Sequence, residues 1–256
     1  MRENHVKRKL ARGDISVGTM MLEFNTTGIA RIASQAGAEF AVFDMEHTGW
    51  SMETVRMLMA TARVAEMVPL VRPPATQYDY ISRILDMGAM GVVVPFVNTP
   101  EQAKFIVQSV KYPPVGRRGT AFGVHHDDYT AGDILEKMRS SNDETLVICQ
   151  IETVEGVENV EKIAAVEGVD GLWIGQFDLT ASLGVPGQVK HAEFLRVSDR
   201  ILKACQKAGK AAGFGSLYLD DIRQAKADGF RFLVYTADLW IYQKALREGL
   251  EQIRAK

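Results

Sequence analysis

Residues 145–178 read TLVICQIETVEGVENVEKIAAVEGVDGLWIGQFD, and this stretch decides the fold. It contains two short apolar runs, TLVICQIE (145–152) and DGLWIG (170–175), which are separated by the amphipathic segment 156–168. A strand that is buried on both faces reads as a nearly continuous apolar run, whereas a helix on the surface of a sheet reads with a period of 3.6 residues. The stretch therefore predicts a strand, a helix and a second strand parallel to the first.

The same alternation recurs along the whole chain. Strands are predicted at 15–21, 40–46, 68–74, 91–97, 145–152, 170–175, 211–215 and 230–238, and helices at 27–37, 51–65, 78–89, 99–110, 156–168 and 191–209. Eight strands with intervening helices are typical of a TIM barrel. The G-x-G-x-x-G fingerprint of an open dinucleotide-binding sheet does not occur, and no Pro/Gly/Ser-rich linker divides the chain. We therefore expect a single (β/α)8 domain over residues 1–256.

The composition excludes several classes of function. The chain has 256 residues, of which 46% are hydrophobic, and a formal net charge of -2, so it has no basic character for binding nucleic acid or an anionic membrane. No apolar run is long enough to span a bilayer. Cys149 and Cys205 lie in an apolar run and a helical pattern, which is not the framework of a disulfide-stapled protein. We expect a cytoplasmic protein that acts on a small molecule.

Polar side chains stand at the ends of four predicted strands. They are Asp44, Glu46 and His47 after the second strand, Arg72 after the third, Gln150 and Glu152 after the fifth, and Asp178 after the sixth. Active sites of TIM barrels lie at the C-terminal ends of the strands. Residues two apart on a strand face the same way, so Gln150 and Glu152 share a face, as do Asp44 and Glu46. These groups are expected to converge on one mouth of the barrel.

Each of these residues alone also has a purely structural interpretation. Glu152 and Asp178 precede predicted helices and could cap them. His47 could be a solvated loop residue, and Arg72 could be a structural ion-pair partner. The combination favours function, because two acids, a histidine, an arginine and a glutamine around one mouth suit a hard cation, a proton carrier and an oxyanion clamp.

The residue types narrow the chemistry further. No lysine stands at these strand ends, and Lys210 enters the seventh strand from the opposite end, so imine formation is not expected. Zinc sites favour His and Cys ligands, whereas the two candidate ligands Glu152 and Asp178 are carboxylates. Oxygen ligands favour Mg²⁺ or Mn²⁺, with Co²⁺ as a further option.

Several motifs together resemble the HpcH/HpaI aldolase family, within the phosphoenolpyruvate/pyruvate barrel superfamily. They are FDMEHTGW (43–50), VRPP (71–74), LDMGAMGVVVPFV (85–97), KYPPVGRRG (111–119), QIETVEGVENVEKI (150–163) and VEGVDGLWIGQFDLTASLG (166–184). The resemblance implies a class II, metal-dependent aldolase that cleaves a 4-hydroxy-2-oxo acid to pyruvate and an aldehyde through a pyruvate enolate. It also implies oxaloacetate decarboxylation as a side activity.

The resemblance assigns the metal and substrate ligands. Glu152 and Asp178 would bind the divalent cation. Gln150, with the backbone around Phe177 and Asp178, would hold the carboxylate end of pyruvate. This chain departs from many relatives here, because it has Gln176 and Phe177 where they have Pro and Ala or Ser. The pocket wall beside the metal is therefore expected to differ.

The resemblance also assigns the groups that move charge. His47 would be the base, and Asp86 would orient it and raise its basicity. Arg72 would clamp the keto oxygen. Asp44 and Glu46 would serve the water shell of the metal.

Two further segments attract interest. The long irregular segment 115–133 is expected to be a functional loop on the aldehyde side of the site, and its His125 and His126 are interpreted as solvated rather than as a second metal site. The last predicted helix, in 238–256, carries an apolar face that could cover its own barrel. In similar aldolases that helix packs on a neighbouring subunit of a hexamer, which is the arrangement we expect here. The apolar residues concerned are Leu239, Trp240, Ile241, Leu246, Leu250 and Ile253.

Two other functions stay open. A lyase of the citrate lyase β-subunit or malyl-CoA type would share the barrel, metal and enolate, but it needs a CoA site, usually a basic patch that the sequence does not reveal. The second is a catalytically silent barrel that acts as a binding protein, which the joint presence of His47, Arg72, Glu152 and Asp178 disfavours.

Overall fold

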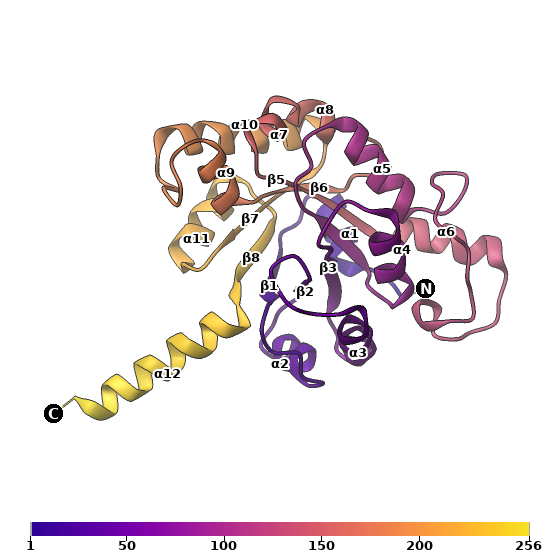
Figure 1. Ribbon diagram of the computed structural model, residues 1–256, viewed down its shortest axis with the longest axis horizontal. Helices are drawn as coiled ribbons and strands as arrows, with labels where there is room; N and C mark the ends of the chain where they lie inside the picture. The colour runs from indigo at the N-terminus through magenta and orange to yellow at the C-terminus, as the bar shows by residue number, and fades with distance from the viewer. Residues whose placement is uncertain (1, 256) are drawn as a thin grey trace.

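The computed structural model describes residues 2–255, and its eight strands close into a parallel barrel in sequence order (Figure 1). The predicted TIM barrel is therefore confirmed. The strands are β1 (Ser16–Met21), β2 (Phe40–Asp44), β3 (Val68–Arg72), β4 (Gly91–Val94), β5 (Leu146–Ile151), β6 (Gly171–Ile174), β7 (Ala211–Ser216) and β8 (Phe232–Ala237).

Helices surround the barrel, and one crosses its N-terminal end. They are α1 (His5–Ala11), α2 (Ile29–Gln35), α3 (Met52–Ala62), α4 (Tyr78–Asp86), α5 (Pro100–Val110), the 3-10 turn η1 (His125–Asp127), α6 (Ile134–Glu144), α7 (Val154–Glu158), α8 (Val160–Ala164), α9 (Gln176–Ser182), α10 (Ala192–Ala208), α11 (Leu219–Asp228) and α12 (Asp238–Arg254).

Side chains alternate between the two faces of each strand, so the barrel has one apolar layer outside the strands and one inside them. Residues such as Phe43, Val71 and Cys149 point outward and pack against the helices. Their neighbours point inward and fill the barrel: the inner layer includes Phe40, Val42, Leu70, Ile148 and Trp173, and Val6 and Leu10 of α1 close it at the N-terminal end. The barrel is thus plugged at one end, which leaves the C-terminal end as the place for a site.

Strand pairing brings the predicted polar residues together at that open end. Asp44 pairs in register with Arg72 across β2 and β3, and Gln150 pairs with Trp173 across β5 and β6. Asp44, Arg72 and Gln150 point into the barrel, as predicted. Each comes two positions after a residue of the same strand that is buried inside the barrel. The convergence expected from the sequence is confirmed.

The last helix, α12, leaves the barrel after β8 and projects into solvent (Figure 1). Asp238 at its first turn is buried, whereas the apolar residues farther along it, including Leu246 and Ile253, are exposed. The alternative that this helix covers its own barrel is therefore wrong. Within residues 2–255, no helix is long and apolar enough to cross a membrane.

The segment that follows α5 lies at the plugged end of the barrel. The guanidinium of Arg63, which precedes β3, contacts both the His125 carbonyl oxygen and the Asp128 carboxylate. A Cβ on Gly88, which precedes β4, would lie 3.4 Å from the His125 ring. Residues that precede strands lie at the N-terminal end, so the expectation that this loop borders the site of its own subunit is wrong.

Candidate active site

Asp44 at the end of β2 and Arg72 at the end of β3 form an ion pair at the mouth of the barrel. Arg72 is the only arginine among the described residues that line the cavity there. Asp44 Oδ1 and Oδ2 accept hydrogen bonds of 2.8 Å each from Arg72 Nε and Nη2. Asp44 is fully buried and Arg72 nearly so. Burial acts to lower the pKa of Arg72, but the paired Asp44 carboxylate outweighs it and raises that pKa. The result is a permanent, oriented positive charge, with Nη1 reaching 3.4 Å to Gln150 Oε1.

Glu152 is buried just beyond β5 and is held from two sides. Its Oε1 accepts a 2.6 Å hydrogen bond from the Phe96 backbone N–H, and its Oε2 accepts a short one from Gln150 Nε2. Phe96 has a positive φ of 52°, a conformation that costs energy for a non-glycine residue and points its N–H at the carboxylate. Gly175 is needed as glycine, because a Cβ there would lie 2.2 Å from Glu152 Oε2.

Carboxylates outnumber the arginine at this mouth. Burial raises the pKa of Glu152 to about 7, with Glu46 and Asp178 raising it further and hydrogen bonds from Gln150 and Phe96 opposing. Burial likewise raises the pKa of Glu46 to about 7, opposed by Arg72 and assisted by Asp44 and Asp178. Glu46 Oε2 is a buried oxygen that accepts no hydrogen bond within residues 2–255. The same oxygen lies 3.2 Å from Arg72 Nε, so this one arginine faces several acids, and such an excess of mutually repelling carboxylates fits a bound cation.

The donor set also fits a cation that keeps part of its water shell. Across the described chain, no cluster of three His, Cys, Asp or Glu side chains forms a complete metal cage. Mg²⁺ is usually held by one or two carboxylates together with water and substrate oxygens, and Glu152 and Asp178 are two carboxylates here that could hold it. Asp178 stands in the first turn of α9 and faces the cavity.

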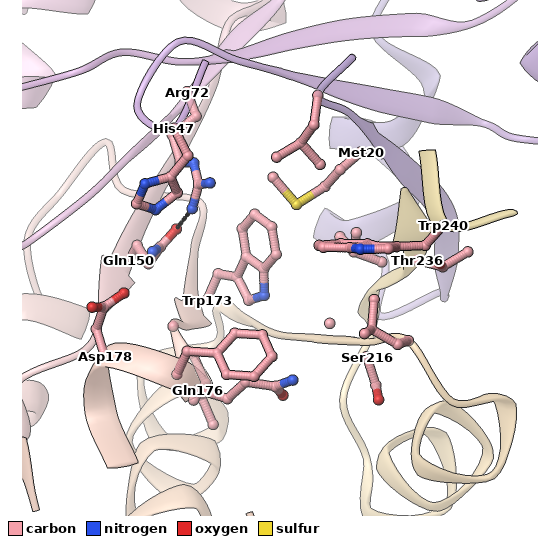
Figure 2. Close-up of a pocket in the computed structure, with 17 residues that line it drawn as sticks. Met20, His47, Arg72, Gln150, Trp173, Gln176, Asp178, Ser216, Thr236 and Trp240 are labelled. Atoms are coloured by element: carbon pink, nitrogen blue, oxygen red, sulfur yellow. Dashed lines mark hydrogen bonds between the residues drawn. The ribbon is translucent and has the colours of Figure 1, made fainter. Parts of the chain in front are cut away.

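A cavity of about 330 Å³ opens beside these groups, and Figure 2 shows its lining. His47, Arg72, Gln150 and Asp178 lie together along one side of it. His47 is more than half exposed, with its Nε2 3.8 Å from Glu46 Oε2. An exposed imidazole beside a fixed guanidinium and an acidic rim can exchange a proton with a molecule held against Arg72.

Asp86 is not in this group. It ends α4, which starts at the C-terminal end of β3 and runs back to the plugged end of the barrel. There its Oδ1 is 2.5 Å from Arg118 Nη2, and it lines a different hollow with His125. No hydrogen bond joins Asp86 to His47 within the described part of one subunit. A dyad of these two residues therefore does not form inside a subunit.

Other residues of the cavity were not foreseen from the sequence. Trp173, Gly215, Thr236 and Trp240 line it on the side away from Arg72. Trp173 could have been found, because it alternates with the outward residues Leu172 and Ile174 of β6 and so had to face inward. The sequence pattern does not indicate that Thr236 lies at the cavity. In the structure its φ is positive, 49°, which is typical of residues held under strain at functional sites.

Asp238 was also missed, and it shapes the cavity indirectly. Its carboxylate accepts hydrogen bonds from the backbone N–H groups of Leu22 (3.0 Å) and Phe24 (2.8 Å). The loop after β1 is thereby tied to the start of α12, which places Leu22 in the cavity wall. A buried aspartate at a helix start reads from sequence only as a cap.

Comparison with known proteins agrees with this fold and identifies the family. The family model described as HpcH/HpaI aldolase/citrate lyase matches residues 19–242. The 2-keto-3-deoxy-L-rhamnonate aldolase of Escherichia coli O9:H4 (strain HS) is 33% identical over 253 residues, 98% of this chain and 94% of that one.

Solved structures give the same result. The HpcH/HpaI aldolase from Desulfitobacterium hafniense DCB-2 superposes with a TM-score of 0.93 at 30% identity, covering 98% of this chain and 96% of that one. An HpcH/HpaI aldolase/citrate lyase family protein from Burkholderia cenocepacia J2315 does so with a TM-score of 0.92 at 30% identity, covering 98% and 100%. The chain therefore belongs to the HpcH/HpaI aldolase/citrate lyase family and is a carbon–carbon lyase.

Proposed function

We propose that this enzyme reversibly cleaves a 4-hydroxy-2-oxo acid to pyruvate and an aldehyde, with a divalent cation at Glu152 and Asp178. The observation that carries the proposal is the buried Arg72, held by Asp44 at the wall of the cavity beside Gln150, with Glu46 and Glu152 in contact with this pair. The cation is Mg²⁺ or Mn²⁺, with Co²⁺ as an alternative. When bound, it supplies a Lewis acid that polarises the oxygens of a 2-oxo acid.

The protein groups have distinct roles in the proposed reaction. Gln150 and the backbone N–H groups of Phe177 and Asp178, which have no intrahelical acceptor in the first turn of α9, bind the carboxylate of pyruvate. Arg72 donates to the oxygen on which negative charge develops as the enolate forms. His47 takes the proton of the C4 hydroxyl during cleavage and returns it during condensation.

Glu46 and Asp44 act on the surroundings of this reaction. Asp44 keeps Arg72 in place, and its Oδ1 also accepts a 3.0 Å hydrogen bond from the Glu46 backbone N–H. Glu46 faces the rim between Arg72 and His47, where it can order water around the cation. The same enolate forms when oxaloacetate loses CO₂, so weak decarboxylation accompanies the main activity.

The experiment that tests this proposal is removal of metal. Chelation should abolish cleavage, and Mg²⁺, Mn²⁺ or Co²⁺ should restore it, because no protein cation except Arg72 lines the described cavity. Borohydride in the presence of pyruvate should trap nothing, since no lysine lines it either. Full activity without metal, or a trapped imine, contradicts the proposal.

Asp86 can support His47 only from a neighbouring subunit, since it lies at the far end of its own barrel. Mixing His47→Ala and Asp86→Asn subunits tests this. If Asp86 acts between subunits, about a quarter of the sites in a random mixture combine an intact His47 with an intact neighbouring Asp86, and activity rises above the average of the two variants. If it acts within a subunit, every site lacks one partner and the mixture shows only that average.

Assembly through α12 is part of the same proposal. The helix leaves its own barrel. Val17 on the outer face of β1 is 40% exposed, so no helix covers this part of the strand. The α12 of another copy of the chain would cover this apolar surface and bury its own apolar face in the same contact. We expect the assembly to be a hexamer.

The buried free thiols Cys149 and Cys205 support a cytoplasmic location.

A CoA-dependent lyase is the less favoured function. Phosphates of CoA need basic side chains, and Arg72 is the only Lys or Arg among the described residues that line the cavity.

A further inference from the structure

The cavity has two unlike ends, as Figure 2 shows. The polar end holds Arg72, Gln150, His47 and Asp178, which the proposed function assigns to pyruvate and to proton transfer. The other end is lined by Met20, Leu22, Trp173, Leu217, Val234 and Trp240. Pyruvate fills only the polar end, so the apolar end faces the carbon skeleton of the aldehyde.

Trp173 forms the floor of the apolar end, and the neighbouring strand is shaped to admit it. Its side chain is 5% exposed and lies edge-on to Phe232, with ring centroids 6.0 Å apart. Gly213 and Gly215 on β7 leave the room for it, because a Cβ would lie 3.2 Å from Trp173 Cβ and 3.1 Å from Trp173 Cζ2, respectively. The indole is thus a fixed wall.

Polar side chains are the minority in the lining around this end, where Ser216, Thr236 and Gln176 carry them. Ser216 Oγ donates to Asp221 Oδ2 at 2.8 Å and accepts from the Tyr218 N–H at 3.1 Å, so it is engaged within the protein. Trp173 Nε1 and Gln176 Oε1 are buried without a hydrogen-bond partner in the described chain, so beside the Thr236 hydroxyl they are the groups that a ligand can engage. A polyhydroxylated aldehyde would lose several hydrogen bonds to water here and regain few, at a cost of about 1–3 kcal/mol for each group left unpaired.

We propose that the aldehyde used by this enzyme has an apolar carbon skeleton, either branched aliphatic or aromatic, which packs against Trp173 and Leu217. The inference rests on the proposed aldolase function. In cleavage, the C3–C4 bond breaks, its electron pair goes to the pyruvate enolate, and the C4 hydroxyl proton goes to His47. The products are pyruvate, once C3 is protonated, and the apolar aldehyde.

The test compares two aldehydes with the same number of non-hydrogen atoms, 3-methylbutanal and glyceraldehyde, in condensation with pyruvate and Mg²⁺ or Mn²⁺. We expect kcat/KM to favour 3-methylbutanal by about 10-fold or more, the scale of hydrophobic-pocket discrimination. Leu217→Asn, on the partly exposed rim, should lower this preference by about 10-fold, and Trp173→Phe should keep an apolar preference. Leu219→Asn is the matched control, because Leu219 is exposed and does not line the cavity.

Exchange of the pyruvate methyl protons, measured on every variant, separates the two proposals. Exchange reports enolate formation at the polar end and needs no aldehyde, so it should be unchanged in the control Leu219→Asn, and in Leu217→Asn it gives the rate against which the change in aldehyde preference is measured. If exchange is intact but glyceraldehyde is preferred, or Leu217→Asn leaves the preference unchanged, the apolar specificity is wrong. If the wild-type enzyme neither exchanges protons nor condenses either aldehyde, the proposed function itself fails, and the inference fails with it.

Discussion

Arg72 has two roles that mutagenesis can separate. It stabilises the negative charge that develops on the substrate, and it pairs with the buried carboxylate of Asp44. Arg72→Ala should lower both aldol cleavage and oxaloacetate decarboxylation by about 100-fold or more, the scale for loss of one oxyanion donor. It also leaves Asp44 buried without its partner, which typically costs about 3–5 kcal/mol. Urea unfolding of the variant should therefore accompany both rate measurements. Arg72→Lys keeps the charge, so a Lys variant as inactive as Ala would point to the bidentate geometry instead.

His47 should affect the two reactions unequally. A base for the C4 hydroxyl is needed when the C3–C4 bond breaks but not when CO₂ leaves, so His47→Ala should impair cleavage more than decarboxylation. Asp86→Asn should show the same pattern more weakly, since it acts through the imidazole. His47 is exposed, and its removal should leave stability unchanged. Equal loss of both activities with metal still bound would mean that His47 acts on the enolate itself.

His126 is a buried histidine whose interpretation as a solvated loop residue is wrong. Its ring packs near Phe122, with centroids 5.6 Å apart, and burial with the nearby Arg118 lowers its pKa from 6.5 to about 4. The neutral form is favoured in the folded state, so between pH 6.5 and 4 the unfolded chain binds a proton that the folded chain does not. Stability should therefore fall as the pH drops through this window.

The variant His126→Phe removes the titrating imidazole, so its comparison with the wild type measures how much that imidazole contributes to the pH dependence of stability. Urea unfolding at pH 7 and at pH 5 should show the wild type losing about 1 kcal/mol more than the variant, a value reduced for partial solvent screening. The difference between the two proteins matters, because carboxylates that titrate nearby are common to both. An equal loss in wild type and His126→Phe would refute a neutral buried His126.

At the scale of the elements, α12 is the helix through which we propose that the hexamer assembles. Leu246 and Leu250 lie one turn apart on a helix that is exposed beyond its first turn. Leu246→Glu with Leu250→Glu should dissociate the hexamer, because carboxylates would be buried between subunits. Light scattering at micromolar concentration measures this. Lys244→Glu, roughly on the opposite side of the helix, is the control and should leave the assembly intact. A wild-type monomer under the same conditions would overturn the expectation.

At the scale of the whole molecule, the metal should stabilise the barrel that binds it. A cation that binds only the folded state at 100 times its Kd adds about 2.7 kcal/mol. Mn²⁺ should therefore raise the unfolding temperature of the wild type but not that of Glu152→Gln. Glu155→Gln, an exposed neighbour on α7, should respond like the wild type. This measurement is independent of activity, and an equal response in Glu152→Gln would remove Glu152 from the ligand set.

The strands and their faces could be predicted from the sequence because both depend on local periodicity. The inward direction of Asp44, Arg72 and Gln150 follows from the apolar residues two and four positions before them, whatever the rest of the chain does. Parallel strands in a closed barrel all end at one mouth, so the convergence of these groups followed too. The position of Asp86 was also within reach, because a helix after a barrel strand must run back to the other end.

The tertiary structure alone decided which distant residues share space. The fit of Trp173 against Gly213 and Gly215, and its unpartnered Nε1, appear only when β6 and β7 lie side by side. The pKa values of Glu46 and Glu152 depend on the burial and mutual repulsion of groups from different strands. The departure of α12 from its barrel depends on packing that its amphipathic pattern does not specify. Periodicity fixes the direction of a side chain from its own neighbours, whereas burial, electrostatics and cavity shape are sums over residues far apart in the chain.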